Sequence, residues 1–387
     1  MIPLEKEAKN KKAADLAVIL PFFLVLVLLP LITFCLPKAN FSEDENRTLA
    51  TAPTLRFDTW KDRTFMDGLE TYMADHFVLR TRWVEAKGIS QKLTGDREIG
   101  GVYLCKDRFI QVQSKTVDEN LERNLMTVSD FADIFSCRPV LMVVPDAASM
   151  LSEYLPPFAP AATHEKEYDL VKNHLSAVTD LPNLYAAFSA VSVEKRADYY
   201  YKTDHHWTVD GAYQAYTMLG ESLGFTPYAT DAFERVSGKN PFYGTLYSKC
   251  LIKSGITADQ MAILEYKGET HFTVTDGEGK QLSDSPFFKE NFDQKDQYLV
   301  NLGLNRNVTV IENAAAEGGT LLVFKDSYAN AVAPFLSLHY QKVILIDPRY
   351  YRGEVQEIAP AGSFDAVLFL FGSDSLYHQN QISKLIF

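Results

Sequence analysis

One carboxylate and two imidazoles stand together in the segment Tyr199-Tyr-Tyr-Lys-Thr-Asp-His-His-Trp-Thr208. In an extended segment, residues two positions apart point to the same side, so we expect Asp204 and His206 to be neighbours and His205 to face away. A carboxylate beside an imidazole fixes the tautomer of the ring and stabilises its protonated form, which is how a general base is prepared. The segment thus supplies a base without an evident nucleophile.

Ser327 is the candidate nucleophile for this base. It follows the apolar run 319–324 after two polar residues and opens the segment Ser327-Tyr-Ala-Asn330. A serine between a strand and a helix places its backbone N–H where unpaired donors and the helix dipole favour an oxyanion. The alternative is that Ser327 only caps the helix, and this turn taken alone favours the cap.

Short apolar runs predict the elements that would position these residues. Four of them have the composition of buried strands in a parallel sheet, and helical or turn segments join the last three as in βαβ units. These runs are 139–146, 319–324, 342–346 and 364–371. Polar residues close each run, and ligand sites of open α/β sheets gather at the carboxyl ends of strands. The expected fold class is therefore α/β, with a parallel sheet flanked by helices.

Three further features complete this outline. A short strand is expected at 183–187, and Thr208 is expected to cap a helix that continues to about Leu223. Residues 226–318 differ from their surroundings, because short strands alternate there with polar loops. These strands are expected at 262–266, 271–275 and 297–301. We interpret 226–318 as a small β-rich insertion packed beside the sheet.

Near its beginning the chain carries an apolar run at 16–36 without a single charge. A helix of this length can span a bilayer core of ~30 Å. Four lysines lie within 1–15 and favour a cytoplasmic N-terminus, with 37–58 as a juxtamembrane linker and 59–387 as an extracytoplasmic domain of the cell envelope. A cleaved signal peptide is the alternative, although its apolar region is usually shorter and ends in small residues. We favour the uncleaved single-pass anchor.

Composition narrows the class of protein. Of the 387 residues 47% are hydrophobic, and the net charge of −12 disfavours nucleic acid as a partner, because phosphates require basic patches. A disulfide among Cys105, Cys137 and Cys250 is left open, and no CxxC pair is present. Asp204 and its two histidines are metal-ligand types, but no third ligand cluster accompanies them, so we expect no metal and no cofactor.

Several spaced motifs resemble those of the DHHW protein family. The signature Asp204-His-His-Trp207 is accompanied, in the same order as in the family, by five further segments. These are 42–47, Asp75-His-Phe77 with Arg80, Phe242-Tyr-Gly-Thr245, Lys325-Asp-Ser-Tyr-Ala-Asn330 and Asp347-Pro-Arg-Tyr350. The family is similar to the alginate O-acetylation proteins (AlgJ and AlgX), which implies an SGNH-hydrolase-like fold. The resemblance runs from about residue 40 to the end of the sequence.

Carried over by this resemblance, Ser327 is the nucleophile, His206 the base and Asp204 its orienting carboxylate. The order is permuted relative to ordinary SGNH hydrolases, because the Asp-x-His pair precedes the serine. The usual oxyanion asparagine is not evident, and Gly372-Ser-Asp374 stands in a comparable place with an aspartate. Arg349 could stabilise the oxyanion instead, or could equally be a structural partner of Asp347.

Tyr328 and Trp207 complete the candidate oxyanion or substrate contacts. Trp207 and the tyrosines before it could stack on sugar rings, although packing is the more common role of such aromatics. The resemblance implies a membrane-anchored serine acyltransferase that O-acetylates an envelope polysaccharide or exopolysaccharide through an acyl-serine. An MBOAT-type membrane acyltransferase would then supply the acyl groups. The alternatives are a carbohydrate esterase with the same triad and a non-catalytic glycan-binding or scaffold protein.

Overall fold

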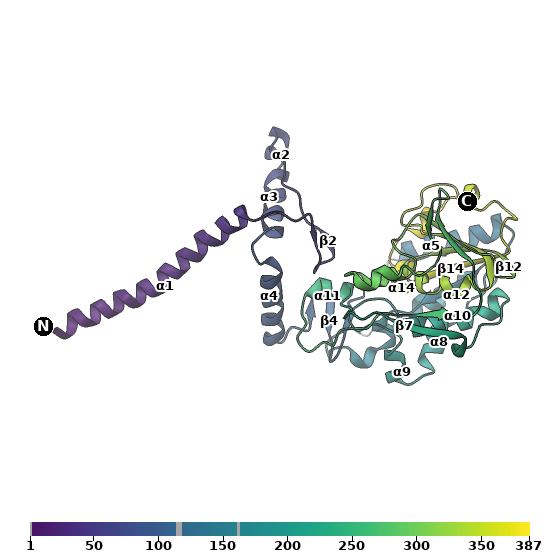
Figure 1. Ribbon diagram of the computed structural model, residues 1–387, viewed down its shortest axis with the longest axis horizontal. Helices are drawn as coiled ribbons and strands as arrows, with labels where there is room; N and C mark the ends of the chain where they lie inside the picture. Colours follow the sequence, from purple (N-terminus) through teal and green to yellow (C-terminus); the bar gives the residue numbers. More distant parts are fainter. Residues whose placement is uncertain (1, 114–117, 161–162) are drawn as a thin grey trace. The chain divides into compact units, whose positions relative to one another are not determined.

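The computed structural model describes residues 2–113, 118–160 and 163–387, and contacts divide the chain into two units. The first unit ends at Thr94 and the second is Gly95–Phe387 (Figure 1). The sequence placed the start of the main domain at residue 59, whereas the helices up to Thr94 group with the first unit.

The first unit is helical apart from one small hairpin. Helix α1 contains a stretch, Asp15–Cys35, whose length and mean hydropathy of 2.9 suit either a membrane anchor or a signal sequence. Three separate helices follow residue 56. The elements are α1 (Ile2–Cys35), β1 (Phe41–Ser42), β2 (Arg47–Thr48), α2 (Phe57–Lys61), α3 (Thr64–Asp75) and α4 (Arg80–Thr94).

A seven-stranded sheet forms the centre of the second unit, in the order β10-β9-β11-β13-β12-β14-β6. The neighbours β13, β12, β14 and β6 are parallel, and the strands on the other side of β13 are antiparallel. The strands are β6 (Val140–Val144), β9 (Phe272–Asp276), β10 (Gln281–Ser283), β11 (Val308–Asn313), β12 (Gly318–Lys325), β13 (Tyr340–Ile346) and β14 (Ala366–Gly372). The four runs that the sequence assigned to a buried parallel sheet are these four parallel strands.

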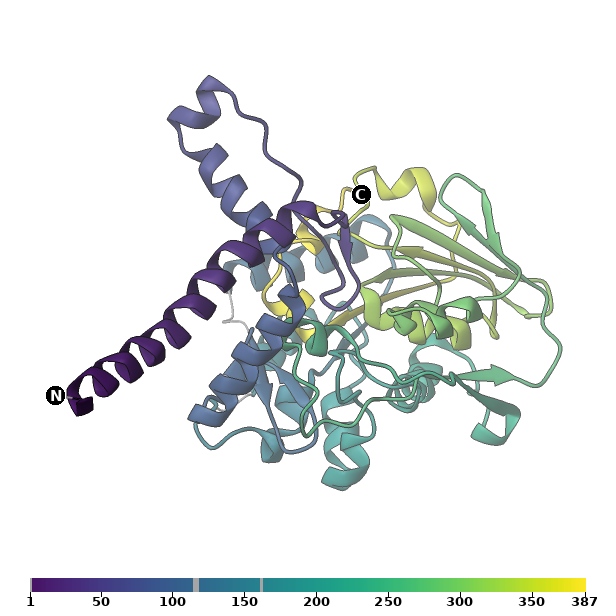
Figure 2. The same ribbon diagram turned by 60° about the vertical axis from the view of Figure 1, so that its left-hand side comes forward.

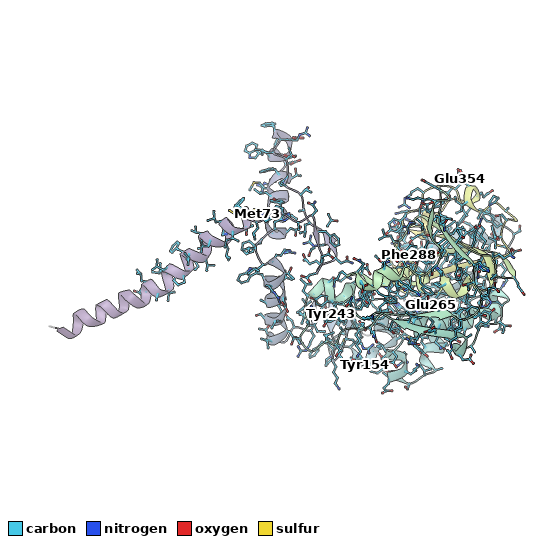
Figure 3. All side chains as sticks on the ribbon, in the orientation of Figure 1. Met73, Tyr154, Tyr243, Glu265, Phe288 and Glu354 are labelled. Atoms are coloured by element: carbon cyan, nitrogen blue, oxygen red, sulfur yellow. The ribbon has the colours of Figure 1, made fainter. Side chains whose placement is uncertain are left out.

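Both faces of this sheet are covered, which explains why its strands are continuously apolar rather than alternating. In β12 the side chains of Leu321 and Val323 enter one hydrophobic cluster, while Leu322 and Phe324 enter the other. Helix α10 (Val209–Leu223) covers the first face, and α5 (Asp118–Ile134) with α7 (Glu165–Leu175) cover the second. Helices flank the sheet in the view of Figure 2, and Figure 3 draws the side chains that lie between these layers. The fold is thus mixed α/β with a mostly parallel, helix-flanked sheet.

Short elements complete the second unit. Its other helices are α6 (Ala147–Met150), α8 (Leu184–Ser189), α9 (Val193–Ala197), α11 (Thr245–Cys250), α12 (Ala333–Leu336), α13 (Val355–Ile358) and α14 (Ser373–Tyr377). The 3₁₀ turns are η1 (Ser152–Tyr154), η2 (Thr230–Ala232), η3 (Lys289–Asp293), η4 (Gln297–Val300), η5 (Ser327–Ala331) and η6 (Ile382–Lys384). Two small sheets pair β3 (Glu98–Ile99), β4 (Val102–Leu104) and β5 (Phe109–Gln111), and β7 (Phe233–Ser237) with β8 (Ala262–Tyr266).

Three expectations about local structure are wrong. Residues 226–318 do not lie wholly beside the sheet, because β9, β10 and β11 extend the central sheet itself and only β7 and β8 form a small sheet apart from it. Residues 183–187 begin helix α8, where the Asn183 side chain accepts a hydrogen bond from the N–H of Ala186. The segment 297–301 is a 3₁₀ turn with a buried tyrosine at position 298 rather than a strand. The sequence pattern of such short runs suits helix and strand equally, so tertiary packing determines which secondary structure they adopt.

Candidate active site

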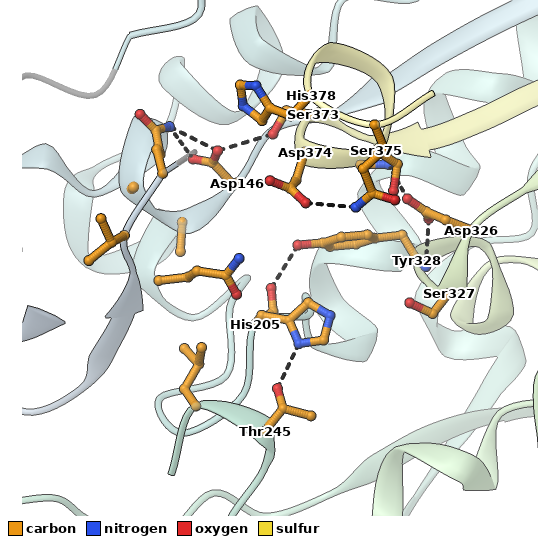
Figure 4. Close-up of a pocket in the computed structure, with 18 of the residues that line it drawn as sticks. Asp146, His205, Thr245, Asp326, Ser327, Tyr328, Ser373, Asp374, Ser375 and His378 are labelled. Atoms are coloured by element: carbon orange, nitrogen blue, oxygen red, sulfur yellow. Dashed lines mark hydrogen bonds between the residues drawn. The ribbon is translucent and has the colours of Figure 1, made fainter. Parts of the chain in front are cut away.

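The carboxyl ends of the parallel strands meet at a cavity of about 340 Å³. Asp146 follows β6, Ser327 follows β12, Arg349 lies shortly after β13, and Ser373 follows β14, and all four line the cavity. Figure 4 shows how polar side chains from these ends surround it. The sheet therefore gathers, at one edge, groups that are far apart in the sequence.

Ser327, His206 and Asp204 form a continuous hydrogen-bonded relay at this edge. The Ser327 hydroxyl Oγ lies 2.7 Å from His206 Nε2, and His206 Nδ1 lies 2.6 Å from Asp204 Oδ1. His206 and Asp204 are buried, while Ser327 is half-buried and borders the cavity. The structure thus brings together the three residues that the sequence singled out.

The orientation of the relay is fixed by groups around it. Asp204 Oδ2 accepts the backbone N–H of Thr245 at 2.7 Å, and Asp204 Oδ1 accepts that of His206 at 2.9 Å. The ring of Tyr298 stacks on His206 with centroids 3.7 Å apart, and its hydroxyl donates to the Ser327 carbonyl oxygen at 3.1 Å. At Gly244 a Cβ atom would lie 2.3 Å from Asp204 Oδ2, so a side chain there would push the carboxylate away.

Electrostatics keeps Asp204 ionised. Burial opposes the charged form, but the positive charge of His206, with His205 and the hydrogen bonds, lowers the pKa of the Asp204 carboxyl far below its ordinary value. An ionised Asp204 stabilises a protonated His206, which is the state that follows transfer of a proton from Ser327. The relay is therefore suited to general-base activation of a hydroxyl.

His205 does not face away from the site, as the extended geometry predicted. The segment is a tight turn, in which Tyr200 and Trp207 pair across an isolated bridge, and the two imidazole rings lie 3.8 Å apart. His205 Nδ1 lies 2.7 Å from Thr245 Oγ1, and the ring borders the cavity. Burial and the neighbouring charge of His206 lower the pKa of His205 to about 3, so the ring is neutral at ordinary pH.

One ligand atom from each of Asp204, His205 and His206 lies within 4.8 Å of the others, a spacing that could hold a metal ion. An ion there would compete for Asp204 Oδ1, which His206 Nδ1 already contacts at 2.6 Å. Both oxygens of the carboxylate are already occupied by hydrogen bonds from the protein. The donor set therefore suits the proton relay better than a metal.

Two of the predicted oxyanion contacts, Arg349 and Gly372, border the cavity but already have partners within the protein. Arg349 borders the cavity, and its guanidinium forms a two-point pair with Asp347, with Nε–Oδ1 at 2.9 Å and Nη2–Oδ2 at 2.6 Å. Gly372 also borders the cavity, but its N–H donates to Asp326 Oδ2 at 2.8 Å, so this donor is already used. The pairing with Asp347 shows that Arg349 does have a structural partner.

Tyr328 and Trp207 lie behind the relay. The Tyr328 hydroxyl donates to the carbonyl oxygen of His205 at 2.7 Å, and its backbone carbonyl accepts the indole N–H of Trp207 at 3.1 Å. Trp207 has no exposed surface and does not border the cavity, so the packing role holds for it. Tyr328 borders the cavity with part of its ring and joins the serine turn to the histidine turn.

Sequence reasoning missed two parts of the site. Asp146 was noted only as a polar strand end, yet it accepts hydrogen bonds from Gln113, Ser373 and the backbone of Ser149, and lies 2.8 Å from His164 Nε2. No local pattern around position 164 indicated this partner.

The second missed part is a buried lysine, Lys325, two residues before Ser327. Lys325 Nζ is buried and donates to the side-chain oxygens of Asn330 at 2.8 Å and Asn305 at 2.9 Å. Burial lowers the pKa of the Lys325 ammonium to about 8, although Asp347 at 3.4 Å opposes this shift. The signal for this role was the Lys325-Asp-Ser run itself, because a charged residue in a buried strand needs partners.

A mostly parallel sheet with a serine, a histidine and an aspartate at its strand ends places the chain among SGNH-hydrolase-like proteins. Residues 109–249 match the family model described as "SGNH hydrolase-like domain, acetyltransferase AlgX". Residues 185–346 match the model of the DHHW protein family. The chain is thus similar to DHHW family proteins over 185–346 and to the SGNH hydrolase-like domain of AlgX over 109–249. No curated protein matches the chain in a sequence comparison.

Solved structures share this fold. A DHHW family protein from Eubacterium siraeum is 23% identical with a TM-score of 0.63, over 75% of this chain and 97% of its own. PatB1 of Bacillus cereus, solved with a sulfonyl adduct, is 21% identical with a TM-score of 0.62, over 74% of this chain and 98% of its own. The O-acetyltransferase domain of Pseudomonas putida AlgJ is more distant, at 17% identity and a TM-score of 0.46, over 71% of this chain and 92% of its own.

Proposed function

We propose that the chain is a serine acyltransferase that O-acetylates a polysaccharide outside the cytoplasmic membrane, with Ser327, His206 and Asp204 as its catalytic residues. The observation that carries this proposal is the relay itself, in which Ser327 Oγ, His206 and Asp204 are joined by contacts of 2.7 Å and 2.6 Å. The match to the acetyltransferase AlgX model supports the choice of acyl transfer among the reactions of this fold.

The reaction would proceed in two halves. In the first, His206 takes the proton of Ser327 while Oγ attacks the acyl carbonyl, and the protonated His206 returns that proton to the leaving group. In the second, His206 deprotonates a sugar hydroxyl, which attacks the acyl-serine and regenerates Ser327 Oγ–H. If water takes the place of the sugar hydroxyl, the same residues give an esterase.

Two donors remain for the oxyanion once Gly372 is set aside. The N–H of Ser327 opens η5, and the first N–H groups of a helical turn have no acceptor within the turn. The Arg349 guanidinium borders the same cavity. It is paired with Asp347 and could also offer its positive charge to an oxyanion in the cavity. The pKa of Arg349 is raised above its ordinary value because hydrogen bonding and charge from Asp347 outweigh burial, so the group stays protonated.

We infer a single-pass anchor at Asp15–Cys35, because that stretch is apolar over the thickness of a bilayer core. The domain from Gly95 onward would then lie outside the membrane, where acetyl donors of the cytoplasm are absent. A multi-pass membrane acyltransferase of the MBOAT type is the partner that this arrangement requires, since one helix cannot carry acyl groups across a bilayer.

Labelling with a fluorophosphonate probe, which reacts with activated serines, tests the catalytic proposal. We expect the full chain in detergent to be labelled, and Ser327→Ala and His206→Ala to abolish the signal. Acyl transfer to oligosaccharides, measured against release of free acetate, then separates a transferase from an esterase. A folded wild-type chain that stays unlabelled would leave glycan binding without catalysis as the better hypothesis.

A further inference from the structure

The corner between α3 and α4 is tied to the end of the apolar helix α1. The Val78 N–H donates to Thr33 Oγ1 at 3.0 Å, and the Lys38 ammonium donates to the Thr33 carbonyl oxygen. Thr33 is only 1% exposed, although its neighbours in α1 are exposed. In both ribbon views α3 and α4 leave this point in opposite directions across the axis of α1 (Figures 1 and 2).

A salt-bridge network makes the corner rigid. Asp75, the last residue of α3, accepts two hydrogen bonds from Arg47 at 2.6 and 3.0 Å and one from the N–H of Ala50 at 2.8 Å. Arg80, the first residue of α4, pairs with Glu45 at 2.8 Å. The hydrogen bond from Arg47 lowers the pKa of the Asp75 carboxyl to about 2, so the network persists at any ordinary pH.

The outer surface of this corner is apolar. Leu79 is 64% exposed and Trp83 is 52% exposed, although both side chains are large and hydrophobic. The Trp83 indole N–H donates to the Val78 carbonyl oxygen at 3.2 Å, which holds the ring against the corner. Next to them the Arg82 side chain is 78% exposed and pairs with Glu85 at 3.1 Å. An exposed tryptophan and leucine beside a cation is the composition of a segment that lies in a membrane interface.

Thr33 sets the depth of this surface. It lies two residues before Cys35, the end of the apolar stretch, so it is ~3 Å from that end along the helix axis. A group that donates to its hydroxyl must therefore lie at the boundary between the hydrocarbon core and the headgroups, if α1 spans the bilayer.

We propose that the corner 77–83 is a membrane-contact surface, seated in the outer interfacial layer of the bilayer that α1 crosses. Leu79 and the Trp83 ring enter the boundary of the acyl chains, and Arg82 meets lipid phosphates. The proposal rests on the anchor inferred above and adds to it a second point of contact. A helix alone leaves the following chain free to rotate and tilt, whereas helix and corner together fix the orientation of the first unit on the membrane.

Tryptophan fluorescence in lipid nanodiscs tests this contact, because the chain has three tryptophans, Trp60, Trp83 and Trp207. Trp207 has no exposed surface and serves as an internal reference. The full-length Trp60→Phe variant reports Trp83 and Trp207, and the Trp60→Phe/Trp83→Phe variant reports Trp207 alone. Both variants are reconstituted with phosphatidylcholine that is brominated either near the headgroup or near the bilayer centre, and circular dichroism serves as the check of folding.

We expect bromine near the headgroup to quench most of the Trp83 emission, bromine at the centre to quench less, and the double variant to be unaffected by either. If the chain enters nanodiscs and Trp83 is not quenched, the anchor stands and the contact surface is refuted. If the chain does not associate with lipid at all, the anchor and the contact surface are both refuted, while the catalytic proposal is untouched. Quenching strongest at the bilayer centre would also contradict an interfacial position.

Discussion

Two aspartate–histidine pairs lie near the strand ends of the sheet, and they differ in which member of the pair contacts a serine. In the first, Asp204 contacts Nδ1 of His206, and Nε2 of that ring contacts the Ser327 hydroxyl. In the second, Asp146 contacts Nε2 of His164, and a serine hydroxyl, that of Ser373, donates to the aspartate at 3.1 Å. The first order is Asp–His–Ser and the second is His–Asp–Ser.

This difference in order separates a reactive site from a structural one. Only in the first pair can the imidazole accept a proton from the serine. Ser373 has no access to the ring of His164, whose remaining nitrogen Nδ1 is buried without a hydrogen-bond partner among the described residues, 3.9 Å from Glu167 Oε2. The Asp146 pair instead joins β6, the residue before α7 and the start of α14, and so holds the far wall of the cavity.

The largest expected effect is loss of the base in the first pair. His206→Ala should lower the rate of fluorophosphonate labelling by roughly 10²–10⁴-fold, because within the described residues His206 is the group hydrogen-bonded to Ser327 Oγ. His164→Ala is the matched control and should leave the labelling rate nearly unchanged in folded protein. Equal losses in the two variants would show that the pairs do not differ in the way their geometry indicates.

The next effect is loss of the carboxylate that orients His206. Asp204→Asn keeps the shape of the side chain but removes its charge, so the tautomer and the protonated form of His206 lose their support. We expect labelling to fall by about 10³-fold, measured in the same assay. A rate within a few-fold of wild type would mean that the stacked ring of Tyr298 is enough to hold the His206 ring in place.

The Asp146–His164 pair should contribute to the stability of the fold at acid pH rather than to the labelling rate of Ser327. Burial opposes ionisation of Asp146, but the hydrogen bond and charge of His164, with Ser149 and Gln113, outweigh it and lower the pKa of Asp146 to about 2. A lowered carboxyl pKa stabilises the fold above the pKa of the unfolded chain, and this contribution is lost as the pH falls through the folded pKa.

Between about pH 4 and about pH 2 the wild type should therefore lose about 2 kcal/mol of unfolding free energy through this group. Asp146→Asn should be less stable at neutral pH by a similar amount and should lack this part of the acid dependence. Chemical denaturation of both proteins across this pH range measures the difference. Parallel curves at every pH would contradict the shift.

The smallest effect concerns the hydroxyl of Tyr298, which donates to the Ser327 carbonyl oxygen at 3.1 Å. Tyr298→Phe keeps the ring stacked on His206 and removes one hydrogen bond worth ~1 kcal/mol, so labelling should slow by about fivefold. Tyr185→Phe is the control, because the Tyr185 hydroxyl lies 3.4 Å from that of Tyr377 and not next to the serine turn. An unchanged rate for Tyr298→Phe would show that the serine turn does not need this support.

The contrast between the two pairs also marks what sequence could predict. The four parallel strands are apolar runs and followed from local pattern, whereas Ser327 was joined to His206 and Asp204 only by the resemblance to the DHHW family. His164 was not predictable, since it reaches Asp146 only after α7 packs on the sheet. The turn that brings His205 to the cavity and the strands β9–β11 that extend the sheet likewise depend on tertiary contacts.

Peptide mapping by mass spectrometry after reaction with a sulfonyl fluoride tests the central claim most directly. The geometry predicts an adduct on Ser327 alone, formed in wild type and in His164→Ala but not in His206→Ala. Ser373, which faces the other aspartate–histidine pair, should stay unmodified throughout. An adduct on Ser373, or one on Ser327 that forms equally fast without His206, would contradict the account.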